Sequence, residues 1–156
     1  MSALSNLSPE EKKQVEKDRK KAINEALKKE KELVEQGKGT RDWTPEQQKD
    51  ILNGNRPRDE NGVAYEGHHM KSVSEFPEHA GNPSNIQWLS YDEHINGAHQ
   101  GNSHNTTNGY YSPNTNEMQS YEGMSPIAPE PIELSNPIVK EIAQEETQER
   151  RIQTPQ

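Results

Sequence analysis

Apolar side chains are sparse in the first 36 residues, where they form a narrow stripe that is partly alanine. Ser8, Pro9 and Glu11 supply a helix-capping box with proline at the first helical position, and Gly37 provides a stop. This pattern predicts one exposed helix. We interpret it as a solvated helix or linker, and the alternative is a docking helix for a partner or for the body of a larger protein.

A second capping box at residues 44–47 predicts a short helix that ends at Asn53 and Gly54. Half of the eight aromatic residues and five of the six histidines follow, at residues 63–102. Their pattern predicts a strand at residues 66–70, a loop, a second strand at residues 85–89, and a helix from Ser90 towards His99. This order predicts an α+β fold.

Asn, Thr, Ser, Gly and Pro dominate the chain from residue 103 onwards. We therefore expect three parts: an exposed helix or linker at 1–40, a folded domain at 41–112, and a largely disordered acidic tail at 113–156. A weak apolar stripe in the tail predicts a short helix at 137–151.

Composition narrows the possible classes of protein. Leu, Ile, Val and Phe provide only 22 of the 156 residues, which excludes a single globule with an ordinary core. No apolar run is long enough to cross a bilayer, so we expect no membrane partner. Cysteine is absent, which excludes a disulfide partner and a thiolate metal site. The N-terminus shows no pattern of a secretory signal peptide.

Histidines are concentrated in the predicted domain, with five between residues 68 and 99. A divalent metal needs two or three neutral imidazoles that converge, and a hydrolytic site needs one more imidazole to accept a proton from water. Neighbouring strand residues point to opposite faces, so His68 and His69 suit different tasks. His94 and His99 on the following helix then offer further metal ligands.

These residues carry a resemblance to a known family. The Gly67-His68-His69 run, then Asn85, then His94 and His99, resembles the HNH endonucleases with their ββα-metal (His-Me finger) core. The similarity is greatest to the GHH-type branch of bacterial polymorphic-toxin nucleases and covers residues 41–112.

The resemblance implies a role for each of these residues. It implies that His68, His94 and His99 bind one divalent ion (Mg, Mn, Ni or Zn), that His69 is the general base, and that Asn85 orients this base. Imidazole ligands favour transition metals, whereas Mg²⁺ prefers oxygen. His79 and His104 are interpreted as surface histidines.

The two helix histidines depart from the family pattern in their spacing. Many members place them four residues apart, whereas His94 and His99 are five apart, about 140° around an ideal helix. Convergence then requires a π-type bulge or early unwinding near Asn96 and Gly97. Alternatively His99 lies beyond the helix, or Asn96 or His104 replaces it.

The resemblance implies an endonuclease that hydrolyses phosphodiester bonds in nucleic acid, with DNA favoured over RNA. It also implies a toxin or effector with a cognate immunity protein, secreted by a specialised system or acting in the cytoplasm of a target cell. Alternatives are a non-catalytic nucleic-acid- or protein-binding module and a phage HNH protein in genome processing. Arg56, Arg58 and Lys71 are the predicted phosphate contacts, although the net charge of −8 opposes nucleic-acid binding.

Overall fold

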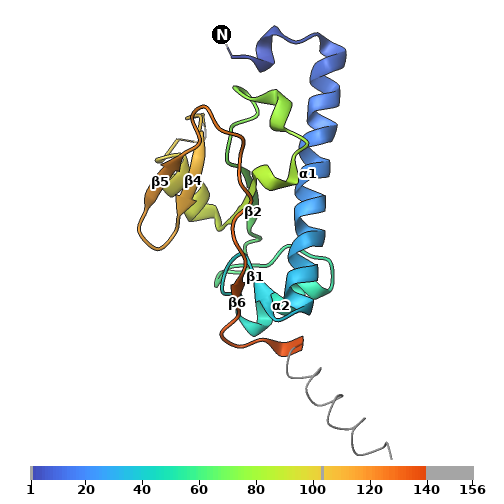
Figure 1. The fold of residues 1–156 in the computed structure, drawn as a ribbon, viewed down its shortest axis with the longest axis vertical. Helices are drawn as coiled ribbons and strands as arrows, with labels where there is room; N and C mark the ends of the chain where they lie inside the picture. Colours follow the sequence, from blue (N-terminus) through green and yellow to red (C-terminus); the bar gives the residue numbers. More distant parts are fainter. Residues whose placement is uncertain (1, 103, 140–156) are drawn as a thin grey trace, which may run out of the picture. The chain divides into compact units, whose positions relative to one another are not determined.

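The structure is a computed structural model that describes residues 2–102 and 104–139. The chain forms two compact units (Figure 1). Residues 1–26 and 58–129 make the first unit, and residues 27–57 and 130–156 belong to the second. The long helix α1 (Pro9–Glu35) contributes to both. The units therefore differ from the predicted division at residues 40 and 112.

Both predicted N-terminal helices are present, and each begins at its predicted capping box. At the start of α1, the Glu11 amide donates to the Ser8 hydroxyl, and the Ser8 amide donates to the Glu11 carboxylate. Helix α2 (Pro45–Leu52) begins with the same exchange between Thr44 and Gln47. These reciprocal bonds satisfy amides that have no partner within the helix.

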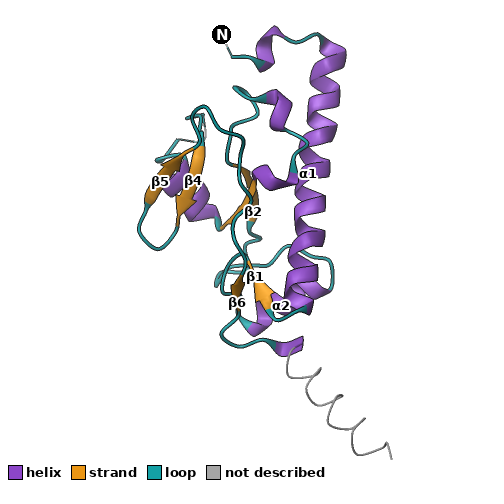
Figure 2. Cartoon of the chain, viewed as in Figure 1, coloured by secondary structure: helices purple, strands orange, loops and turns teal. Residues whose placement is uncertain are grey.

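A strand–strand–helix motif forms the centre of the first unit, as the sequence predicted (Figure 2). Strand β2 (Glu66–His69) pairs antiparallel with β3 (Ile86–Leu89), and this register places His68 opposite Gln87. The short 3₁₀ helices η2 (Pro77–His79) and η3 (Pro83–Asn85) lie in the loop between the strands. The helical turn η4 (Glu93–Ala98) follows β3. The class is α+β.

A hairpin completes this unit. Strand β4 (Gly109–Ser112) pairs antiparallel with β5 (Glu117–Ser120). This corrects the prediction of disorder from residue 113. Every residue of β5 is exposed, so the strand has no alternating apolar pattern that a sequence analysis could detect.

A small apolar cluster joins the hairpin to η4. Leu89, Ala98 and Tyr111 are buried together. A Cβ on Gly97 would lie 2.5 Å from the Tyr111 ring and hydroxyl, so only glycine allows this approach of η4 to β4. The Gln87 side chain, also buried, bonds both the amide and the carbonyl of Tyr111. These contacts fix the turn that carries His94.

The N-terminal part of α1 packs directly against the histidine strand. A Cβ on Gly67 would lie 3.0 Å from two carbon atoms of Ile23, so the glycine lets the helix approach β2 closely. A Cβ on Gly81 would lie 3.2 Å from the Asp18 Cβ. The predicted linker helix is therefore part of the structure around β2.

The second unit is built on a buried carboxylate. Glu30, only 2% exposed, accepts hydrogen bonds from the Thr40 amide and hydroxyl and from the Trp43 indole, each 2.8 Å long. Strand β1 (Lys38–Gly39) pairs with β6 (Ile132–Glu133). Residues 130–139 are thus ordered here, contrary to the predicted tail. The predicted helix at 137–151 lies largely outside the described residues.

We expect Glu30→Ala to lower the free energy of unfolding of the second unit by about 3 kcal/mol, because it leaves the buried Trp43 and Thr40 donors without an acceptor. Glu30→Gln keeps an oxygen for these donors and removes a buried charge, so its stability should match or exceed that of the wild type. Urea denaturation followed by Trp fluorescence measures both variants. A Gln variant as unstable as the Ala variant would contradict this account.

The pH dependence of stability gives a second prediction. Burial raises the pKa of Glu30 above its ordinary value of 4.5, more than its hydrogen bonds lower it. The folded state therefore holds this proton more tightly than the unfolded state. The stabilising effect of this bound proton is complete below pH 4.5. It is lost as the pH rises through the pKa that Glu30 has in the folded state. The advantage of Glu30→Gln over the wild type should consequently grow between pH 4 and pH 7.

Candidate metal centre

Strand β2 ends with two buried histidines. His68 is 1% exposed and His69 is 8% exposed. Because successive side chains alternate across a strand, the two imidazoles leave the backbone in opposite directions. His68 faces the side on which η4 brings His94 and His99.

A π-helical turn brings His94 and His99 together despite their five-residue spacing. The His99 amide donates to the His94 carbonyl over 3.0 Å, an i to i+5 hydrogen bond. The turn η4 spans Asn96 and Gly97, where the sequence located the required bulge. A wider turn places residues five apart above one another, so both imidazoles leave the same side of the helix.

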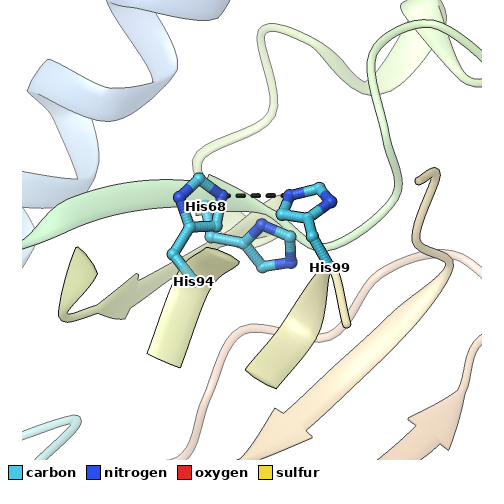
Figure 3. A group of neighbouring side chains, drawn as sticks. All are labelled: His68, His94 and His99. Atoms are coloured by element: carbon cyan, nitrogen blue, oxygen red, sulfur yellow. Dashed lines mark hydrogen bonds between the residues drawn. The ribbon is translucent and has the colours of Figure 1, made fainter. Parts of the chain in front are cut away.

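Three imidazoles converge in the structure (Figure 3). The ring centres of His68 lie 4.8 Å from His94 and 5.1 Å from His99, and those of His94 and His99 are 4.7 Å apart. One ligand nitrogen from each ring lies within 4.8 Å of the other two. This is the only such group among residues 2–102 and 104–139.

Hydrogen-bond acceptors orient two of these rings through their Nδ1 atoms. His94 Nδ1 lies 3.1 Å from the Glu66 carboxylate, and His99 Nδ1 lies 2.6 Å from the Asn105 carbonyl. Both partners only accept, so both Nδ1 atoms carry protons. In the neutral rings the two Nε2 lone pairs then face each other across 3.1 Å (Figure 3). A cation that accepts both lone pairs resolves this conflict.

The spacing of the His94 and His99 nitrogens also fits a metal ion. With metal–nitrogen bonds of about 2.0–2.1 Å, two ligand nitrogens lie about 2.9 Å apart at a right angle and about 3.3 Å apart in a tetrahedron. The observed 3.1 Å between His94 Nε2 and His99 Nε2 falls between these values. The carboxylate behind His94 is a common outer partner of a metal-binding imidazole.

Burial keeps two of these imidazoles, His68 and His94, in their metal-binding form. Burial, with smaller contributions from the neighbouring histidines, holds the pKa of His68 well below its usual 6.5. Burial likewise lowers the pKa of His94, although Glu66 opposes the shift. Neutral imidazole is the form that binds a metal, so little proton release is needed on binding.

His69 has a different environment. Its Nε2 lies 3.0 Å from the Ala80 carbonyl, which only accepts, so Nε2 carries the proton and Nδ1 carries the lone pair. Burial lowers the pKa of His69 to about 4, despite the opposing bond to Ala80. The ring is therefore neutral near pH 7, with one nitrogen ready to accept a proton.

Asn85 fastens the loop that orients His69. Its side-chain oxygen accepts from the Lys71 amide at 2.8 Å, and its amide donates to the Lys71 carbonyl at 3.0 Å and the His79 carbonyl at 3.4 Å. The side chain, fully buried, thus links the end of β2 to the residue preceding Ala80. The geometry suits the orienting role predicted for Asn85, and that role stays a prediction.

One cavity of about 430 Å³ collects the histidines of the site. Its lining includes His68, His69, His94 and His99, together with the exposed His104. Arg19 from α1 also lines it, and no described residue of the lining is Asp or Glu. The sequence analysis missed Arg19 because the helix pattern alone does not show which face meets β2.

The predicted phosphate contacts are not found around this cavity. Lys71 is 3% exposed, with its Nζ donating to the Tyr121 carbonyl at 2.9 Å and lying 4.4 Å from the Phe76 ring. The burial of Lys71 corrects the prediction that this residue contacts the substrate. Arg58 is exposed, forms an isolated antiparallel β-bridge with Ala64, and is absent from the described lining. Arg56 belongs to the second unit.

The alternative ligands receive no support from the geometry. The Asn96 amide donates to the Asp92 carboxylate at 2.8 Å. His104 lines the cavity but is outside the converging group of described residues. His79 lies on η2.

The family comparison agrees with this geometry. The Tox-GHH family, a GHH-signature-containing nuclease toxin of the HNH/Endo VII superfamily, matches residues 9–90, more than half of the chain. The chain belongs to this family. The matched region contains His68, His69 and Asn85, and its start at residue 9 includes α1. It ends before His94 and His99, whose place in the site rests on the geometry above.

The predicted resemblance to GHH-type nucleases is therefore confirmed, and the chain is a nuclease toxin domain by family membership. The comparisons with curated proteins and with solved structures found no significant match. Within residues 2–102 and 104–139, no helix has the length and apolar character needed to cross a membrane.

We expect Glu66→Ala to weaken Zn²⁺ or Ni²⁺ binding about 10- to 100-fold, because His94 loses the carboxylate that orients its ring and holds its tautomer. Isothermal titration calorimetry of the metal-stripped protein measures this change. Glu75→Ala removes the same charge from an exposed residue of the same unit and should bind as the wild type does. Equal affinity of the two variants would count against the site.

Proposed function

We propose that this domain is a metal-dependent endonuclease that hydrolyses phosphodiester bonds in nucleic acid, with DNA favoured over RNA. The observation that carries the proposal is the convergence of three imidazoles beside a fourth, differently bonded histidine in one cavity. Such a cavity offers a cation site and a separate proton acceptor, the two elements that metal-assisted hydrolysis requires. The preference for DNA rests on family analogy.

In this proposal His68, His94 and His99 hold one divalent ion. Three nitrogen ligands favour Zn²⁺ or Ni²⁺ over Mg²⁺, which prefers oxygen ligands and retains waters. When bound, the ion supplies a Lewis acid for the scissile phosphate and the leaving oxygen. Glu66 and Asn105 hold two of the ligand rings in their required tautomer.

His69 acts as the general base. Its Nδ1 takes one proton from a water molecule while the water oxygen forms a bond to phosphorus and the bond from phosphorus to the leaving oxygen breaks. The Ala80 carbonyl holds the opposite nitrogen and stabilises the imidazolium that forms. Asn85 acts as a positioning residue, because it fastens the loop that presents this carbonyl.

The biological setting follows from the family. A nuclease toxin requires protection of the cell that makes it, so we infer a cognate immunity protein that binds this domain. We also infer delivery by a specialised secretion system and action in the cytoplasm of the target cell. A gene for a small immunity protein beside the toxin gene would support this setting. A neighbourhood of phage genome-processing genes would instead favour the phage HNH alternative.

We expect His69→Ala to lower the rate of plasmid cleavage at least about 100-fold, because it removes the proposed acceptor for the proton of the attacking water. Nicking of supercoiled plasmid, linear DNA and RNA, each with Mg²⁺, Mn²⁺, Ni²⁺ or Zn²⁺, measures the activity and the substrate preference. Circular dichroism and metal titration should be unchanged, since His69 is not one of the proposed ligands.

His79→Ala is the matched control. It removes a histidine on η2, in the loop that follows β2, whose ring is not part of the converging group. Its cleavage rate should equal that of the wild type. A wild-type protein that binds nucleic acid but cuts neither DNA nor RNA with any of the four metals would favour the non-catalytic binding module.

A further inference from the structure

The described lining of the histidine cavity differs in charge from the chain as a whole. The chain has a net charge of −8, yet the described lining of the cavity contains no carboxylate and one permanently charged cation, Arg19. Arginine stays protonated at all physiological pH values. The cavity is therefore suited to an anion.

Helix α1 directs Arg19 towards this cavity. Ile23, one turn after Arg19 on the same helix face, packs against Gly67 beside the two histidines of β2. Asp18, directly before Arg19, packs against Gly81, next to the carbonyl that bonds His69. These contacts on either side of Arg19 fix the rotation of the helix and so fix which side chain faces the site.

Arg19 is weakly paired. Its Nε lies 3.9 Å from a Glu16 carboxylate oxygen, and the two side chains are 42% and 56% exposed. An exposed pair at this separation is easily exchanged for another anion. Arg19 lines the same cavity as His69 and His94.

We propose that Arg19 binds the non-bridging oxygens of the scissile phosphate. The inference rests on the proposed nuclease function and adds a substrate-binding residue from α1, outside the strand–strand–helix motif. As the water oxygen bonds to phosphorus and His69 takes the proton, negative charge increases on these oxygens. The guanidinium remains protonated and stabilises that charge until the bond to the leaving oxygen breaks.

The geometry of the guanidinium gives the proposal its specificity. Its planar fork can bind two phosphate oxygens at once, whereas an ammonium group acts as a point charge. Arg19→Lys should therefore restore part of the activity lost in Arg19→Ala. A purely structural role, or a role through general charge alone, would not give this order of activity.

Cleavage kinetics of the full chain test the proposal first. Arg19→Ala should lower kcat about 100-fold with a smaller change in KM, because the charge it stabilises increases in the transition state. Lys21→Ala is the matched control: it removes one positive charge from the same helix, about 200° around the axis, and breaks a similar exposed pair with Glu25 at 3.8 Å. The control should cleave as the wild type does.

Equilibrium binding gives a readout that does not depend on cleavage. The variants are compared in a His69→Ala background, using a fluorescently labelled DNA duplex over a range of salt concentrations. Arg19→Ala should reduce the slope of log affinity against log salt by about 0.9, the value for one lost phosphate contact. Lys21→Ala should leave the slope unchanged.

The outcomes separate this inference from the function on which it rests. A wild-type protein that cleaves while Arg19→Ala and Lys21→Ala have equal kcat and equal salt slopes would overturn the role of Arg19 alone. A salt slope that falls only in Arg19→Ala, in a protein that cuts no substrate, would support the phosphate contact and overturn the nuclease proposal. The absence of any DNA or RNA binding would overturn both.

Discussion

A single backbone hydrogen bond, from the His99 amide to the His94 carbonyl, determines how the candidate centre is assembled. An ordinary α-helical turn would separate the two imidazoles by about 140°. The π-helical turn brings them to one side, where β2 presents His68. Gly97 in this turn approaches Tyr111 so closely that a side chain there would collide with it. The same glycine that permits the packing thus lies inside the turn that makes the ligands converge.

An acidic chain can hold an anion-binding cavity because net charge and local potential are separate quantities. Charged groups separated by more than about 8–10 Å of salt solution have little influence on one another. Arg19 and the histidines lie in one cavity, whereas the Glu66 carboxylate is directed at the back of His94. A bound divalent ion would make the cavity more positive still. The negative charge elsewhere limits non-specific binding more than it limits chemistry at the site.

Local patterns predicted local structure well. The capping boxes at Ser8 and Thr44 fixed the start of both helices, and the order of strand, strand and helix followed from residues 66–99. Long-range pairing was not predictable. Nothing near Arg19 in the sequence indicates that its side chain lines the cavity. Nothing near Lys71 indicates that its side chain is buried and donates to the Tyr121 carbonyl. The β4–β5 hairpin was missed because backbone pairing, rather than apolar alternation, defines it.

The weakness of the apolar core links folding to the metal. In the first unit the largest fully buried side chains include His68 and Asn85, positions that larger domains fill with hydrocarbon. A buried imidazole loses its hydrogen bonds with water and recovers them only through a partner. For His94 and His99 the Nε2 lone pairs face each other, so part of that cost remains until a cation binds. Metal binding energy would then become folding energy, and the residues that would catalyse the reaction would also stabilise the fold.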